Sequence, residues 1–166
     1  MMIRKLGISD CKELFALYAH YTAVENRPPL SPAHMAEIWQ EIERNPGVNY
    51  FVTELEGKLA VACILTITPS FIRGGGGYGV IEHVVTHADF RRRGLARELM
   101  DFTLDFAWSE GCSEVMLLSG SDLAPAHALY EDLGFDKRQR TGAVAVSVED
   151  LTVVATGFGV LVSISY

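Results

Sequence analysis

Six consecutive residues near the middle of the chain, Arg91-Arg92-Arg93-Gly94-Leu95-Ala96, combine positive charge with a glycine at the start of an expected helix. The first turn of a helix has backbone N–H groups without intrahelical acceptors, and the helix dipole places partial positive charge there. Such a site binds phosphate oxygens, whereas basic residues are unfavourable there unless an anion compensates them. Gly94 allows close approach of the backbone, Ala96 is small, and Arg97 adds a fourth charge. The segment predicts a pyrophosphate-binding turn, although an arginine could instead be solvated or paired with an acid.

Glu82 and His83 lie side by side within Val80-Ile81-Glu82-His83-Val84-Val85-Thr86, an otherwise apolar strand. A carboxylate in a central strand is costly to bury without a purpose. We interpret Glu82 as a general base, acting directly or through water, with His83 as the competing candidate and an arginine-paired, strand-end carboxylate as the structural alternative. Regular alternation places Glu82 on the face of Val84 and Thr86 and His83 on the other face, although a β-bulge would reset that register.

The periods of the apolar residues predict the elements that position these groups. Strands are expected at 2–6, 48–55, 59–67, 78–86 and 115–118, and again from Phe135 onward. Helices are expected after Ser9 or Asp10, after Ser31-Pro32, from Leu95 to about Glu110-Gly111, and from Asp122 to Leu133. The 48–86 meander requires antiparallel pairing, with Glu56-Gly57 as its first turn, whereas strand-helix-strand units require parallel neighbours. We therefore expect an α+β fold of three layers (α/β/α) around a mixed sheet.

Composition limits the possible classes of protein. The 166 residues fit a single domain, 1–166, and the formal net charge of −7 disfavours binding to nucleic acid. The longest uncharged runs, 59–72 and 151–166, fall short of the roughly 20 residues that span a bilayer, and no signal segment is visible, so we expect a cytoplasmic protein without membrane contact. Three widely spaced cysteines and no metal-ligand spacing predict neither disulfides nor a metal site.

The segment Arg91 to Ala96 resembles the acyl-coenzyme A signature of the GNAT acetyltransferase superfamily: Gln or Arg, two variable residues, Gly, one variable residue, then Gly or Ala. The later segment Ala126-His127-Ala128-Leu129-Tyr130-Glu131-Asp132-Leu133-Gly134-Phe135 is similar to the family's Ala-x-x-Leu-Tyr-x-x-x-Gly-Phe. The resemblance extends over about residues 1–146 and implies a mixed sheet of six or seven strands with about four helices. It implies acetyl-CoA as cosubstrate, with pantetheine on the main chain of Val84, Val85 and Thr86 and pyrophosphate on the N–H groups of Arg92 through Arg97.

By the same resemblance Tyr130 is the general acid that protonates the departing thiolate, and a phenol with a pKa of about 10 suits that step. Tyr130 also fits the apolar face of its helix, which is its structural alternative. The function that follows is acetyl transfer from acetyl-CoA to a primary amine of a small molecule by direct attack. The alternative is a non-catalytic acyl-coenzyme A-binding sensor or protein-interaction module.

The segment 147–166 is an atypical apolar C-terminal extension for this resemblance. Its apolar residues are too numerous for a solvated tail. It could add a strand, cover a sheet edge or pair between subunits, so a homodimer is possible.

Overall fold

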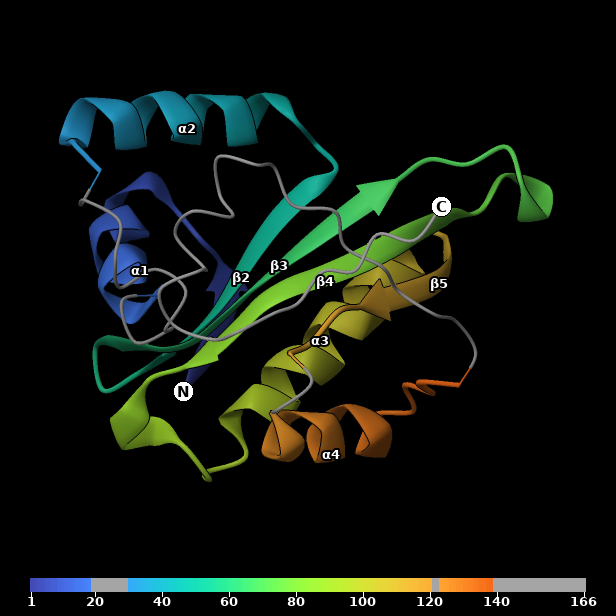
Figure 1. Cartoon of the computed structure of the whole chain (residues 1–166). Coiled ribbons are helices and arrows are strands. Elements are labelled where there is room, and N and C mark those ends of the chain that lie inside the picture. Colours follow the sequence, from blue (N-terminus) through green and yellow to red (C-terminus); the bar gives the residue numbers. More distant parts are fainter. Residues whose placement is uncertain (19–29, 121–122, 139–166) are drawn as a thin grey trace, which may run out of the picture. The chain divides into compact units, whose positions relative to one another are not determined.

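The computed structural model describes residues 1–18, 30–120 and 123–138, and residues Met1–Phe135 form one compact unit (Figure 1). The strands are β1 (Met2–Lys5), β2 (Val48–Leu55), β3 (Lys58–Thr68), β4 (Gly77–Thr86) and β5 (Cys112–Leu117). The helices are α1 (Cys11–Tyr18), α2 (Pro32–Arg44), α3 (Leu95–Ser109) and α4 (Ala124–Asp132), with short 3₁₀ turns at Ile8–Asp10, Arg73–Gly75 and Ala88–Phe90.

The compact unit has three layers, with α1 and α2 on one face of the sheet and α3 and α4 on the other (Figure 1). Strand alternation separates two apolar clusters, one against each pair of helices. The cluster on the α1 side contains Leu6, Leu14, Leu17, Trp39, Val52, Leu59, Ala62 and Val85. The cluster on the α3 side contains Phe51, Ala60, Val61, Cys63, Leu65, Ile81, Phe90, Leu95, Leu99, Met100, Ala107 and Cys112. The predicted α+β class with three layers is confirmed.

The sheet is mixed, with strand order β1-β2-β3-β4-β5. The pairs β1–β2, β2–β3 and β3–β4 are antiparallel, and β4–β5 is parallel, as a crossover through α3 requires. Glu56 and Gly57 both adopt positive φ, 56° and 72°, which is the geometry of a tight hairpin turn between β2 and β3. The meander and the parallel unit both match the expectation from sequence.

The ends of the helices follow capping chemistry. Ser31 Oγ accepts a hydrogen bond from His34 N at 3.2 Å, and Pro32 opens α2. Gly94 stands before α3 with φ of 80°, and Gly111 follows it with φ of 79°. These ends agree with the sequence, whereas the expected cap Asp122 lies outside the described residues and α4 begins at Ala124.

Two expectations about strands differ from the structure. The strand β5, which pairs in parallel with β4, begins three residues earlier than expected, at Cys112. Residues 135–138 form no strand, because the chain turns there and Asp136 Oδ1 accepts from the Arg138 backbone N–H at 3.0 Å. The described residues therefore hold five strands, and the further strands expected within 139–166 lie outside them.

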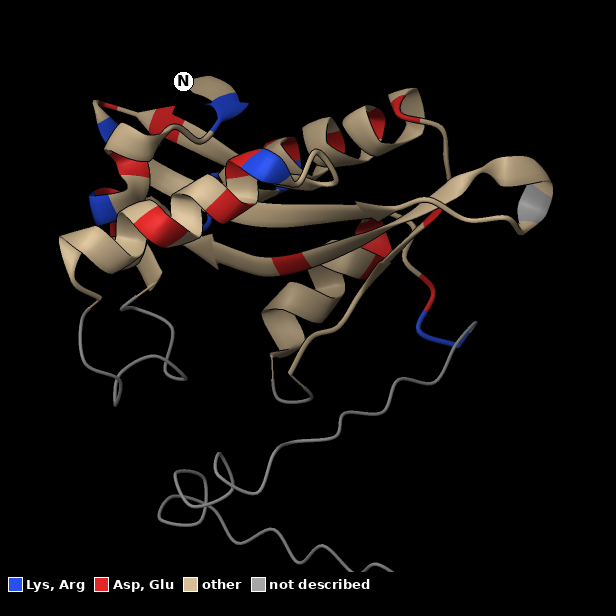
Figure 2. Cartoon of the chain, turned by 90° about the horizontal axis from the view of Figure 1, so that it is seen from above, with Lys and Arg blue, Asp and Glu red and all other residues tan. Residues whose placement is uncertain are grey.

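Acidic residues are spread along α2 and α3, consistent with the net charge of −7 (Figure 2). In the described ranges no helix is both long and apolar enough to span a membrane. The same ranges contain no group of three or more His, Cys, Asp or Glu side chains placed to hold a metal ion.

Candidate active site

A cleft opens where β4 and β5 separate. Their parallel pairing ends at Ile81 opposite Leu117, while β4 continues to Thr86 along β3 alone. The described chain therefore leaves the β5-facing edge of β4 open beyond Ile81. The cleft is lined by Ile81, Glu82, His83, Val84, Leu117, Leu118, Ser119, Gly120, Leu123 and Tyr130. An open strand edge of this kind can pair with the amide groups of an extended ligand.

A β-bulge in β4 interrupts the strand at this place. Glu82 pairs with Ile64 and Val85 pairs with Ala62, so two residues of β4, His83 and Val84, stand opposite the single residue between Ala62 and Ile64. His83 adopts φ of 50°, a left-handed conformation that is uncommon for residues other than glycine. The extra residue changes which side chains share a face.

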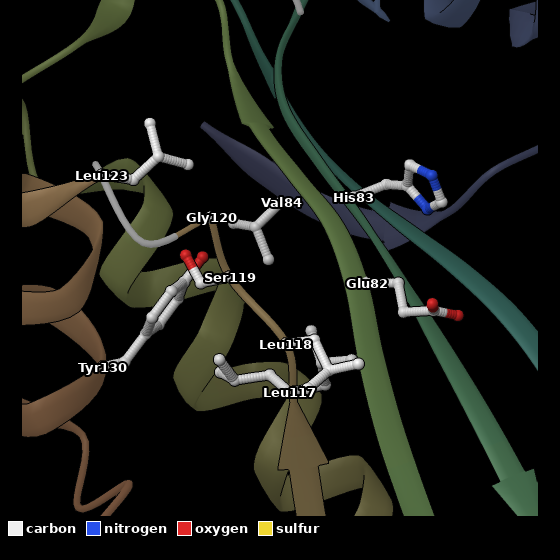
Figure 3. Close-up of a pocket in the computed structure, with 10 residues that line it drawn as sticks. Glu82, His83, Val84, Leu117, Leu118, Ser119, Gly120, Leu123 and Tyr130 are labelled. Carbon is white, nitrogen blue, oxygen red and sulfur yellow. The ribbon is translucent and has the colours of Figure 1, made fainter. Parts of the chain in front are cut away.

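The bulge corrects the expected face assignment. Val84 packs against the apolar cluster on the α3 side, whereas Val85 belongs to the cluster on the α1 side. Figure 3 shows Val84 directed toward β5 and α4, with Glu82 and His83 on the other side of the strand. The assignment expected from regular alternation, with Glu82 on the face of Val84 and His83 on the other face, is wrong because the β-bulge named as the alternative is present and resets the register.

Glu82 and His83 are both exposed and both lie near aromatic residues of the α1 side. The ring of Tyr18, the last residue of α1, lies 5.9 Å from the His83 ring between centroids. Burial raises the pKa of Tyr50, and Cys11 and the carboxylate of Glu82 raise it further. Both candidate bases therefore face the same side of the sheet, and neither is paired with an arginine in any contact of the described chain.

Tyr130 approaches the cleft from α4 on the α3 side (Figure 3). Its ring packs against the apolar cluster there and meets Phe135 edge to face, with centroids 6.2 Å apart. The two interpretations of Tyr130 are thus compatible, since one edge of the ring packs while the residue lines the cleft. Ser119 and Gly120 line the cleft at the end of β5.

The basic turn follows β4 directly and leads into α3. Arg92 adopts φ of 59° and Gly94 adopts φ of 80°. The first hydrogen bond of α3 is donated by Glu98 N to Gly94 O, at 3.2 Å. The preceding N–H groups are those that a helix start leaves without intrahelical acceptors. A Cβ on Gly94 would meet nothing within 4 Å, so glycine is required there by φ rather than by space.

Three of the four arginines have partners within the described chain. Arg91 Nε donates to Thr86 O at 3.3 Å, which ties the turn to the end of β4. Arg93 lies 3.9 Å from Glu56 and above the Phe90 ring, and Arg97 contacts Asp132 at 3.4 Å. Arg92 is exposed, and within the described chain its side chain has no hydrogen bond or ion pair. The partners are exposed carboxylates or a carbonyl. Because exposed ion pairs are weak, these arginine side chains can still move to contact an anion.

The arrangement brings together most of the residues predicted from sequence. Glu82, Val84 and Tyr130 line one cleft, and Val85, Thr86 and the Arg91–Arg97 turn continue from it along the chain. Tyr18 and Tyr50 were not predicted as site residues. No local sequence pattern marks these two tyrosines. Tyr50, for example, lies near Glu82 only through the strand registers, because Tyr50 pairs with Ile64 and Ile64 pairs with Glu82.

The described chain thus combines a cleft, an open edge of β4 and a basic helix start on one α+β fold of three layers. A model of the Acetyltransferase (GNAT) family matches residues 12–135. The chain belongs to this family and is an acetyltransferase; acetyltransferases of the family use acetyl-CoA.

Relatives agree with this assignment. Glucosamine 6-phosphate N-acetyltransferase from Trypanosoma brucei brucei is 33% identical over 140 residues, covering 83% of this chain and 90% of that protein. The enzyme of the same name from Arabidopsis thaliana is 30% identical over 119 residues, covering 69% and 78%. The crystal structure of the Arabidopsis enzyme superimposes with a TM-score of 0.76 at 27% identity, covering 88% of this chain and 98% of that one.

Proposed function

We propose that this chain transfers the acetyl group of acetyl-CoA to a primary amine of a small molecule by direct attack. The observation that carries the proposal is the cleft itself. It has an open β4 edge, two candidate bases on the α1 side of the strand and a phenol from α4 on the other side. An amine and a thioester could therefore meet at the bulge from opposite faces of the sheet.

The donor would lie along the open edge and end at the basic turn. The main chain of Val84, Val85 and Thr86 offers groups for the amides of pantetheine. The N–H groups of Arg92 through Arg97, at the start of α3, would bind the pyrophosphate, and the arginine side chains would add charge. Arg91 supports this turn through its bond to Thr86.

The proton steps fall to groups on both sides of β4. The amine must lose a proton before or during attack, and Glu82, directly or through water, is the proposed base with His83 as the competitor. The thiolate that departs needs a proton, and Tyr130 is the proposed donor. Exposure of Glu82 and His83 means that water can reach either group.

Direct attack is favoured over a covalent enzyme intermediate. Burial raises the pKa of Cys63 to about 11 despite a hydrogen bond with Thr103 that lowers it, and burial also raises the pKa of Cys112. A buried thiol with a raised pKa is a poor nucleophile near neutral pH. Neither cysteine lines the cleft.

The first acceptor to test is glucosamine 6-phosphate, the substrate in the names of the two relatives above. The test measures coenzyme A release with that compound, other amino sugars, polyamines, aminoglycosides, amino acids and peptides. Absence of release with every amine, together with an unchanged melting temperature in acetyl-CoA, would reject the proposal.

We expect Glu82→Gln and Tyr130→Phe each to lower kcat by about 100-fold or more, because each removes a proton-transfer group. His83→Gln should lower kcat less if Glu82 is the base. Tyr78→Phe, a change on β4 away from the cleft, is the control. If activity of Glu82→Gln recovers as pH rises and the amine loses its proton in solution, proton removal is the role of Glu82; a loss that persists indicates a further role.

The second candidate is a non-catalytic acyl-coenzyme A-binding module, which the intact cofactor turn would also serve. It predicts that acetyl-CoA raises the melting temperature while no amine releases thiol. It also predicts that Tyr130→Phe has no consequence beyond stability.

A further inference from the structure

The α1 side of the bulge is lined by a row of residues that belongs to three adjacent strands. Tyr50 of β2 pairs with Ile64 of β3, and Ile64 pairs with Glu82 of β4. Directly opposed residues of antiparallel strands point to the same face. Tyr50 and Glu82 therefore stand on either side of Ile64, and the raised pKa of Tyr50 reflects burial first, then Cys11 and Glu82.

Tyr18, at the end of α1, lies against the same region of β4. Its ring lies 5.9 Å from the His83 ring at an interplanar angle of 49°. Its hydroxyl oxygen is buried and makes no hydrogen bond with any described residue. Burial raises the pKa of Tyr18, so the phenol keeps its proton and remains a donor.

A buried hydroxyl without a partner costs free energy, and such groups in native structures call for an explanation. The proposed acceptor binds beside Glu82 and His83, and the Tyr18 ring lies against the His83 ring, so the Tyr18 side chain borders the proposed acceptor position. An amine with an oxygen on the neighbouring carbon offers both a cation for Glu82 and an acceptor for Tyr18. A plain alkyl amine would leave the hydroxyl unsatisfied.

We propose that Tyr18 is a specificity-determining residue of the acceptor subsite, which selects primary amines that carry a hydroxyl or other acceptor oxygen on the neighbouring carbon. Glu82 faces the ammonium group and the Tyr18 hydroxyl donates to the oxygen. Tyr50 and the ring of His83 bound the subsite. This inference rests on the proposed acetyl transfer and specifies its substrate class.

The test compares trans-2-aminocyclohexanol with cyclohexylamine, and the best acceptor of the amine panel with its analogue that lacks the neighbouring oxygen. The parent protein should show the higher kcat/KM for the oxygen-bearing member of each pair. Tyr18→Phe should lower kcat/KM for that member about tenfold, mainly through KM, and change the other member by less than twofold.

The phenylalanine keeps the ring against His83, so Tyr18→Phe should melt at the parent temperature or above it, since it removes only an unsatisfied group. Tyr78→Phe on β4 serves as the matched control and should change neither ratio. Equal loss on both members of a pair, or no loss, overturns the inference while leaving acetyl transfer intact. A best acceptor without the neighbouring oxygen overturns it as well. Failure of the parent protein to release coenzyme A with any amine rejects the proposed function instead, before the variants are compared.

Discussion

Gly94 and Gly111 stand at the two ends of α3 with nearly the same backbone conformation, φ of 80° and 79°. A Cβ on either residue would meet nothing within 4 Å. An L-residue in the left-handed region costs about 1–2 kcal/mol, whichever end it occupies. Comparing a substitution at Gly94 with the same substitution at Gly111 therefore separates the cost of backbone strain from an effect on binding.

We expect Gly94→Ala and Gly111→Ala each to lower the free energy of unfolding by about 1–2 kcal/mol. Only Gly94→Ala should also weaken acetyl-CoA binding, because only Gly94 lies where N–H groups are proposed to meet the pyrophosphate. Urea unfolding measures the first effect and calorimetric titration the second. Equal affinities in the two variants would contradict the role given to the turn.

The site could be predicted from sequence only where its residues are local. Arg91 to Ala96 and the Tyr130 segment are contiguous motifs, so their types and order were readable. Tyr18 and Tyr50 carry no such pattern, because α1 and two strand registers bring them to Glu82. In the sequence each is one more aromatic position on an apolar face.

At the scale of elements, an ion-pair network connects β1 to β2 and to the 3₁₀ turn before α1. Arg4 of β1 donates to Asp10 Oδ2 at 2.6 Å and to Glu54 Oε2 at 3.0 Å. Asp10 also accepts from Gly7 N at 2.8 Å, which closes the turn before α1. The hydrogen bond from Arg4 is the main cause of the lowered pKa of Asp10, and the Gly7 N–H lowers it further against the opposing effect of burial.

A carboxylate whose pKa is lower in the folded state stabilises the fold at pH values above its unfolded pKa, near 3.8, and loses this contribution as pH falls through the folded value. We expect Asp10→Asn to lower the unfolding free energy by about 1–2 kcal/mol at pH 7. The gap between the parent and the variant should close on acidification below about pH 4. Urea unfolding from pH 7 to pH 3 measures the gap, and a gap that stays constant would mean that the ion pair contributes nothing.

The order and class of the elements followed from periodicity, since amphipathic helices and apolar strands bury their faces in only a few ways. The bulge did not follow, because alternation in 80–86 looks the same with or without an extra residue. The φ of 50° at His83 is imposed by the surrounding structure, because histidine as a residue type does not specify a left-handed conformation. The side of the sheet to which Glu82 points, relative to Val84, could therefore not be predicted from the alternation of apolar residues.

The whole molecule carries a net charge of −7, yet its proposed donor is an anion. The four arginines of the turn supply the local attraction that the overall charge opposes. Since three of them are already shared with Thr86, Glu56 and Asp132, Arg92 is the side chain with most freedom to meet phosphate. Binding of the donor should consequently weaken as salt screens the turn.

Acetyl-CoA at 100 times its Kd should stabilise the folded chain by about 2.7 kcal/mol. For a chain of this size that corresponds to a rise in Tm of about 5–10 °C. Scanning calorimetry with and without acetyl-CoA measures the rise, and Arg92→Ala should reduce it at a fixed ligand concentration. Adenosine, which lacks the pyrophosphate, should give a much smaller rise; an equal rise would show that the turn is not used.

The stretch of β4 beyond Ile81, open toward β5 in the described chain, has one more consequence. A bare strand edge is a template for any extended backbone, including that of another protein molecule. A ligand with amide groups would occupy the same edge and act as a short surrogate strand. Under the proposed mode of donor binding, cosubstrate supply and self-association would be coupled: molecules with bound acetyl-CoA would cover this strand edge, and molecules without it would expose the edge to one another.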